Sequence, residues 1–128
     1  MIAAIISFFV ILLSFNFFTM SYQINGINRL VYGAPMSLFE TAIDFFNVDE
    51  EDGPYFDKPT LMDNVSTYFA FHMPRYNENY SLAFYYYKIE DHSLDMSNKA
   101  KAVEVTLSTS LILSYQYSKT MYYEIRSN

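Results

Sequence analysis

The chain has 128 residues and a formal net charge of −6, with 8 Lys and Arg against 14 Asp and Glu. This acidic balance disfavours a nucleic-acid-binding protein, which normally presents a basic stripe, and it also disfavours attraction to anionic lipid. Because the chain has no cysteine, disulfide scaffolds, thiolate metal sites and cysteine nucleophiles are excluded. Beyond an apolar N-terminal stretch, the remaining length suits a single small domain.

The N-terminal stretch MIAAIISFFVILLSFNFFTM carries no charged side chain. As a helix, residues 2–20 would be about 28 Å long, close to the roughly 30 Å hydrocarbon core of a bilayer. We therefore predict a single-pass transmembrane anchor at residues 1–20. The side chains predicted to face lipid are Ile2, Ile5, Ile6, Phe8, Phe9, Ile11, Leu12, Leu13, Phe15, Phe17 and Phe18.

Two other interpretations of this stretch stay open. A cleaved signal peptide has a basic residue before a shorter apolar run and small residues at its cleavage site, and neither feature stands out here. A core helix of a soluble protein is apolar along one side only, whereas this stretch is apolar all round. A retained anchor in the cell membrane is favoured, with the rest of the chain expected outside the cytoplasm. Arg29, the basic residue nearest the anchor, lies on its C-terminal side and points weakly against this orientation.

Residues 21–48 are predicted to form a helical juxtamembrane segment. Ile24, Ile27 and Leu30 recur at helical spacing, and the stretch YGAP at 32–35 interrupts the pattern because Gly and Pro are strong helix breakers. The helix is expected to resume in MSLFETAIDFFNV. Ser37 and Glu40 have the spacing of a capping box at its start.

Residues 49–59 read as an acidic loop followed by another helix. A solvated loop is favoured over a hard-cation site, since the spacing does not match an EF-hand; its acids are Asp49, Glu50, Glu51, Asp52 and Asp57. From Thr60, a predicted N-cap, the pattern is helical up to Pro74. A strand over 65–71 is the alternative, because β-branched and aromatic residues are frequent there.

The C-terminal part of the chain has the pattern of a sheet. Residues 80–90 read as an aromatic-rich strand, and from Val103 to Ile125 the odd positions are mainly apolar while the even ones are mainly polar. One strand of this length would reach about 75 Å, so two or three strands are expected, with breaks at 108–110 and 118–120. The predicted fold class is α+β: a transmembrane helix, one or two further helices, then an antiparallel sheet of three or four strands. Residues 49–128 would form a small extracytoplasmic α+β domain.

No combination of residues indicates catalysis, so we expect a protein that is not an enzyme and binds no metal or cofactor. The two histidines, His72 and His92, lack the companions of a zinc site or a catalytic triad. Tyr85, Tyr86 and Tyr87, followed by Lys88, admit two interpretations. Cross-strand packing is favoured, and a surface that stacks glycan or peptide is the alternative.

The order of these features resembles pilin-like proteins, in particular the tight-adherence minor pilins and pseudopilins (TadE-like proteins). The resemblance extends over the chain as architecture and rests on MIAAIISFFVILLSFNFFTM and the closing KAVEVTLSTSLILSYQYSKTMYYEI. It implies a helix that anchors the subunit in the membrane and packs in the core of a filament or its assembly complex. We therefore expect a structural or assembly subunit of a cell-surface appendage or secretion apparatus, with other subunits as partners. The alternative is a membrane-anchored extracytoplasmic binding module.

Overall fold

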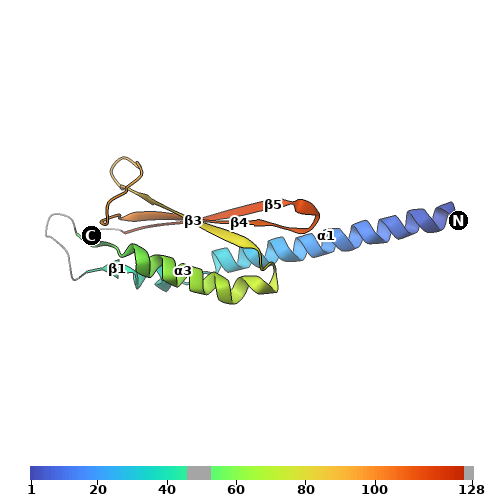
Figure 1. Ribbon diagram of the computed structural model, residues 1–128, viewed down its shortest axis with the longest axis horizontal. Helices are drawn as coiled ribbons and strands as arrows, with labels where there is room; N and C mark the ends of the chain where they lie inside the picture. The colour runs from blue at the N-terminus through green and yellow to red at the C-terminus, as the bar shows by residue number, and fades with distance from the viewer. Residues whose placement is uncertain (46–52, 126–128) are drawn as a thin grey trace.

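The computed structural model describes residues 1–45 and 53–125. It confirms the α+β class: a long apolar N-terminal helix, further helices, and a C-terminal antiparallel sheet with strand order β3-β4-β5 (Figure 1). The elements are α1 (Ile2–Tyr32), α2 (Ser37–Glu40), β1 (Ile43–Asp44), β2 (Tyr55–Phe56), α3 (Lys58–His72), the 3₁₀ turn η1 (Met73–Arg75), β3 (Tyr80–Tyr87), β4 (Ala102–Ser110), the 3₁₀ turn η2 (Ile112–Ser114) and β5 (Gln116–Glu124).

Helix α1 is continuous from the predicted anchor into the body of the protein. Its N-terminal half projects beyond the sheet, and its C-terminal half lies against the sheet (Figure 1). Gly26, Ile27 and Val31 are its buried residues, all in the second half. The helix ends where YGAP predicted an interruption, with the Gly33 N–H donating to the Arg29 carbonyl at 2.8 Å.

The sheet has one covered face and one open face. Along β4, Val103, Val105 and Leu107 are buried, and they alternate with partly exposed polar residues. All three of their partners in β3, and in β5 the partners of Val103 and Val105, are also packed against the core, whereas Leu107 pairs with Lys119 in β5. The C-terminal half of α1 and helix α3 lie on this covered face (Figure 1). The period-2 pattern predicted from the sequence is therefore confirmed, because one face packs against helices and the other meets solvent.

The predicted strand breaks are wrong in position. Strand β4 continues to Ser110, and residues 118–120 lie inside β5. The chain reverses at residues 111–115, where the Leu111 N–H donates to the Tyr115 carbonyl at 2.7 Å. Thr109 pairs with Tyr117, so the odd positions stay on one face across the turn. The turn has neither Gly nor Pro, and for this reason its place was hidden in the sequence.

The second helix is much shorter than predicted. It spans only Ser37–Glu40, begins at Met36 as N-cap, and shows no side-chain cap, so the expected capping box does not form. Tertiary pairing replaces the helix beyond it: Ile43 in β1 pairs with Phe56 in β2, and the Ala42 carbonyl accepts from the Asp57 N–H at 2.8 Å. Residues 46–48 of the predicted helix lie outside the described residues.

The predicted loop at 49–59 is wrong in its second part. Residues 55 and 56 form β2, and α3 starts at Lys58 with Asp57 as N-cap in place of Thr60. The Thr60 hydroxyl instead donates to the Asp57 carboxylate. Helix α3 excludes the alternative strand over 65–71. The remaining acids of the loop (Asp49, Glu50, Glu51 and Asp52) lie outside the described residues.

Candidate functional site

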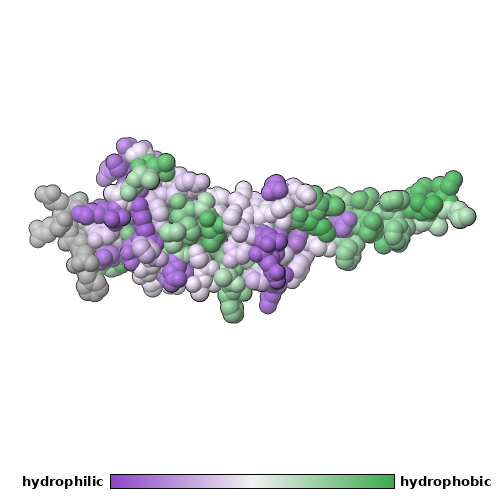
Figure 2. Space-filling view, viewed as in Figure 1, coloured by the Kyte–Doolittle hydropathy of each residue, from purple (hydrophilic) through white to green (hydrophobic). Residues whose placement is uncertain are grey.

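The N-terminal half of α1 presents a long apolar surface. Every predicted anchor side chain is exposed, from 45% for Leu12 to 76% for Ile2 and Phe18. In Figure 2 this projecting part of the helix is mostly green, with a small purple area. By length and composition this helix can cross a membrane. A side chain of this size gains about 1.5–3 kcal/mol when it leaves water, so lipid or protein must cover such a surface.

One of the weakly polar residues in this stretch, Thr19, has a hydrogen-bond partner within the helix. The Thr19 hydroxyl donates to the Phe15 carbonyl at 3.0 Å, one turn earlier in the same helix. A hydroxyl that bonds back to its own helix needs no water. The predicted anchor residues thus form a surface that is apolar all round, and the first charged side chain, Arg29, lies beyond it.

At the junction between the two halves, α1 makes close contact with the rest of the body. A Cβ on Gly26 would lie 2.0 Å from Cε1 of Tyr76, so only glycine allows the Tyr76 ring to approach here. Tyr22 also packs on the Tyr76 ring, with centroids 5.4 Å apart. The amide of Gln23 donates to the Tyr76 carbonyl at 3.1 Å and accepts from the Ile112 N–H at 3.5 Å. Gln23 therefore links α1 to two separate loops.

Further along α1, tyrosines from other elements hold the helix in place. The Tyr68 hydroxyl of α3 donates to the Leu30 carbonyl at 2.9 Å, and the Tyr117 hydroxyl of β5 donates to the Asn28 side chain. Ile27 is fully buried in the core between these contacts. The C-terminal half of α1 is thus part of the folded body.

The predicted aromatic surface is divided between the two faces of the sheet. Tyr86 points to the covered face, where burial raises its pKa to about 12 and Lys58 Nζ lies 4.5 Å from the ring centroid. Its buried hydroxyl has no hydrogen-bond partner within the described part of the chain. Tyr85 and Tyr87 alternate with it and lie on the open face.

On the open face, Glu104 brings together residues that the sequence analysis did not connect. Tyr85 and Tyr122 are its partners on the two neighbouring strands. The Tyr87 hydroxyl donates to Glu104 Oε2 at 2.8 Å, and this bond to a carboxylate raises the pKa of Tyr87. Tyr85 and Tyr122 are each about half exposed, at 46% and 48%. Glu104 and Tyr122 are both even positions of the period-2 pattern, so the alternation in the sequence already placed them on the same face of the sheet.

Lys88 lies just after the end of β3, apart from the open face that Tyr85 and Tyr87 share. It lines a small hollow of about 350 Å³ together with Asp95, Lys99 and Lys101. Burial alone would raise the pKa of the Asp95 carboxyl, but hydrogen bonds from Ser97 and the nearby lysines outweigh burial and lower it. The predicted group of three tyrosines and a lysine is therefore not one surface.

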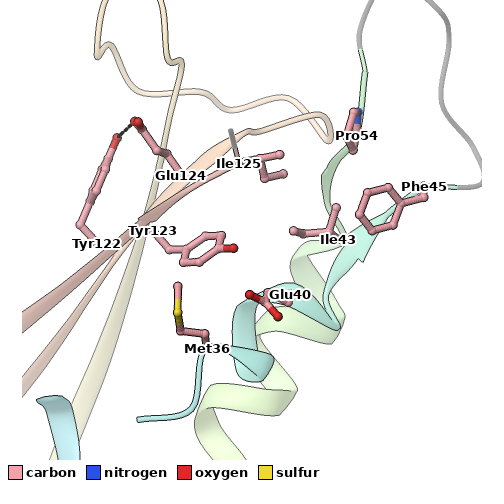
Figure 3. Close-up of a pocket in the computed structure, with 9 residues that line it drawn as sticks. All are labelled: Met36, Glu40, Ile43, Phe45, Pro54, Tyr122, Tyr123, Glu124 and Ile125. Atoms are coloured by element: carbon pink, nitrogen blue, oxygen red, sulfur yellow. Dashed lines mark hydrogen bonds between the residues drawn. The ribbon is translucent and has the colours of Figure 1, made fainter. Parts of the chain in front are cut away.

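A larger cleft of about 890 Å³ lies between β5 and the segment that holds α2 and β1 (Figure 3). Its described lining is mainly apolar, with Glu40 and Glu124 as the carboxylates; the residues are Met36, Glu40, Ile43, Phe45, Pro54, Tyr122, Tyr123, Glu124 and Ile125. Glu124 accepts from the Tyr122 hydroxyl at 3.1 Å. The lining shown in Figure 3 contains no histidine, serine or threonine that could serve as base or nucleophile.

The two histidines lie in different parts of the body. His72 packs against the Tyr68 ring on α3, with centroids 4.6 Å apart, and His92 is exposed in the β3–β4 connection. Within residues 1–45 and 53–125, no three His, Asp or Glu side chains gather as metal ligands. The candidate functional site is therefore the projecting half of α1, whose exposed apolar surface must be covered, together with its junction to the body.

Protein-family models, curated proteins and solved structures were compared with this chain, and none of them matches it.

Proposed function

We propose that this protein is a membrane-anchored, pilin-like subunit with a structural or assembly role rather than an enzymatic one. In this proposal residues 1–20 cross the cell membrane once, and the body lies outside the cytoplasm. Other subunits of a cell-surface appendage or secretion apparatus are its partners. The observation that carries the proposal is the division of α1 into an exposed apolar half and a half that belongs to the core.

An apolar surface all round the helix suits two environments in turn. In a bilayer, lipid tails cover it, and in an assembly the helices of neighbouring subunits can replace lipid without loss of apolar contact. A charged or one-sided helix would fit only one of these environments. Because the same helix continues into the core through Ile27 and Val31, packing of the anchors would also position the bodies.

The charges near the anchor give little information on orientation, and the single basic residue there counts weakly against an extracytoplasmic body. Within about 20 residues of the anchor, the region that counts for orientation, Arg29 is the one basic residue. This flank therefore lacks the cluster of Lys and Arg typical of a cytoplasmic side. The body also has net negative charge, which gives it no attraction to anionic lipid headgroups.

Cysteine labelling of intact cells tests the topology, because the natural chain has no cysteine. Met96→Cys places a thiol at a position that is 89% exposed in the body, and Leu12→Cys places one in the middle of the anchor. We expect a membrane-impermeant maleimide to label the Met96→Cys variant on intact cells and to leave the Leu12→Cys variant unlabelled until the membrane is dissolved. Labelling of Met96→Cys only after lysis would contradict the proposed orientation.

Disulfide cross-linking tests assembly. Single cysteines at the four consecutive positions Phe8, Phe9, Val10 and Ile11 lie about 100° apart and so sample the circumference of the helix. We expect mild oxidation in membranes to link subunits at some of these positions and not at others, since a specific interface uses one side of a helix. Met96→Cys is the control for random collision. Equal cross-linking at all positions, or none, would contradict an assembly through the anchor.

A second candidate, an anchored binding module, rests on Tyr85 and Tyr122 beside Glu104 on the open face. Exposed aromatic rings next to a carboxylate can stack on sugars and accept a hydrogen bond from them. The test is a titration of the full-length protein with soluble oligosaccharides, in which tyrosine fluorescence is the measured signal. The double variant Tyr85→Ser/Tyr122→Ser should lose the response, whereas Tyr86→Phe on the covered face should keep it. A response that survives in the double variant would exclude this face.

A further inference from the structure

The β4–β5 turn, residues 111–115, is the part of the body that reaches farthest along α1 toward its N-terminus (Figure 1). The Ile112 N–H donates to Gln23 Oε1 at 3.5 Å, so the base of the turn lies beside α1 three residues after Met20. Met20 is the last residue of the predicted anchor. The turn is thus at the level where α1 would leave the hydrocarbon core of a membrane.

This turn exposes apolar side chains, and one of them, Leu113, has a backbone conformation that leucine disfavours. Leu113 is 63% exposed, and Tyr115 is 48% exposed. Leu113 has φ 61° and ψ 26°, and Ser114 has φ 58°. Two successive residues with positive φ are normally Asn and Gly, and a leucine there costs about 1–2 kcal/mol. A largely exposed leucine at such a position is the kind of strained feature from which a contact outside the body can be inferred.

The composition around the turn fits the boundary between headgroups and lipid tails. Residues 111–115 carry no charge, and neither does α1 between Phe18 and Ile24. Tyr22 on α1 is 57% exposed at the same level as the turn. Tyrosines are enriched at this depth of a membrane because the ring is apolar and the hydroxyl is polar. Since the body is acidic, a contact with lipid has to be apolar rather than electrostatic.

We propose that the β4–β5 turn is a second membrane contact, in which Leu113 inserts between the lipid headgroups while Tyr22 and Tyr115 lie at the interface. The proposal rests on the anchor proposed above, since lipid reaches the turn only if α1 spans the bilayer. Lipid is the occupant because the turn continues the apolar surface of α1 without an intervening charge. Two contacts, helix and turn, would fix the rotation of the body about α1 and so set the direction in which its open face points.

The absence of tryptophan from the chain allows a direct test with one fluorophore at a time. Three full-length variants are reconstituted in phosphatidylcholine vesicles: Leu113→Trp in the turn, Phe9→Trp in the anchor, and Met96→Trp in the β3–β4 connection at the opposite end of the sheet. Emission is compared with and without lipids brominated either close to the headgroup or near the end of the acyl chain. All three positions are exposed in the free protein, so the substitutions leave the core intact.

We expect quenching of the Leu113→Trp variant to be several-fold stronger than that of the Met96→Trp variant, with a blue-shifted emission. Quenching of Phe9→Trp with no difference between the other two variants would overturn the membrane contact and leave the anchor standing. A Phe9→Trp variant that escapes bromolipid at every depth would overturn the anchor and the contact together. A blue shift of Leu113→Trp without quenching would mean that protein covers the turn, which also overturns the proposal.

Discussion

The two halves of α1 share one continuous backbone but have different surroundings. Ile11 in the first half is 68% exposed, whereas Ile27 in the second half is fully buried. The first half has no buried residue, and the second half presents Ile27 and Val31 to the core. The comparison teaches that the helix is a local property of the chain, while the role of each half depends on what covers its side chains.

The second difference between the halves is polar. In the second half, the Gln23 side chain donates a hydrogen bond to another element. The Asn28 side chain and the Leu30 carbonyl each accept one. In the first half, Thr19 bonds only within its own helix. Directional bonds fix one arrangement of a helix against its neighbours, and an apolar surface without them allows many. The body half is therefore held in one position, and the projecting half is free to meet lipid or other subunits.

The largest expected effect separates the two halves by the same chemical change. Ile27→Ala should lower the free energy of unfolding of the body by about 2–5 kcal/mol, because it removes a fully buried side chain. Ile11→Ala should leave that free energy unchanged. Thermal unfolding in detergent micelles, followed by the near-ultraviolet circular dichroism of the tyrosines, measures both. Equal destabilisation by the two variants would contradict the division of α1.

A smaller effect is expected at the junction. Gly26→Ala should destabilise the body by about 1–3 kcal/mol, because the new methyl group would clash with the Tyr76 ring. The double variant Gly26→Ala/Tyr76→Ala should lose less unfolding free energy than the two single variants lose together, because without the Tyr76 ring the new methyl group meets no clash. Asn25→Ala, at the exposed neighbouring position, is the control. Strict additivity of the two changes would show that the ring is not the obstacle.

The turn that follows the junction should respond in the opposite direction. Leu113→Gly should raise the free energy of unfolding by about 0.5–1 kcal/mol, because relief of the positive φ exceeds the added flexibility of the unfolded chain. Chemical denaturation in micelles measures the change. A loss of stability would mean that the Leu113 side chain packs on the body. The turn would then belong with the packed half of α1 and not with its exposed half.

The smallest effect concerns pH, to which only the body should respond, since no charged side chain precedes Arg29. The pKa of Asp95 is lowered in the folded protein, so its carboxylate adds stability above the unfolded pKa, and this stability is lost as the pH falls through the folded pKa. Asp95→Asn should therefore destabilise the body at pH 7 by under about 1 kcal/mol and have no effect near pH 2. Asp63→Asn, on the exposed side of α3, is the matched control. An equal effect at both pH values would contradict this role of the charge.

The regular elements were predictable where a local pattern extends over many residues. The apolar run of α1, its end at Gly33, and the alternation in β4 and β5 all follow from side-chain period and from the loss of helix at Gly and Pro. The short pairing of β1 with β2 was not predictable. Ile43 and Phe56 are 13 positions apart and lie in segments predicted as helix and loop, so no local pattern indicated that they pair.

The candidate site was predictable in the same uneven way. The exposed anchor residues follow from composition alone, but the alternation of Tyr85, Tyr86 and Tyr87 shows only that neighbours point to opposite faces. Which face is covered depends on where α3 packs. The link from Gln23 to Tyr76 and Ile112 joins residues that are 53 and 89 positions apart, and no sequence period carries such information.

The sequence by itself determined that the protein has an uncharged helix long enough to span a bilayer and a sheet with one apolar face, because both depend on side chains a few residues apart. Only the tertiary structure decided where α1 changes from exposed to buried, that Gly26 receives the Tyr76 ring, and that the β4–β5 turn lies beside the end of the apolar run. These features depend on contacts between distant segments, and such contacts exist only after the sheet has packed against α1 and α3.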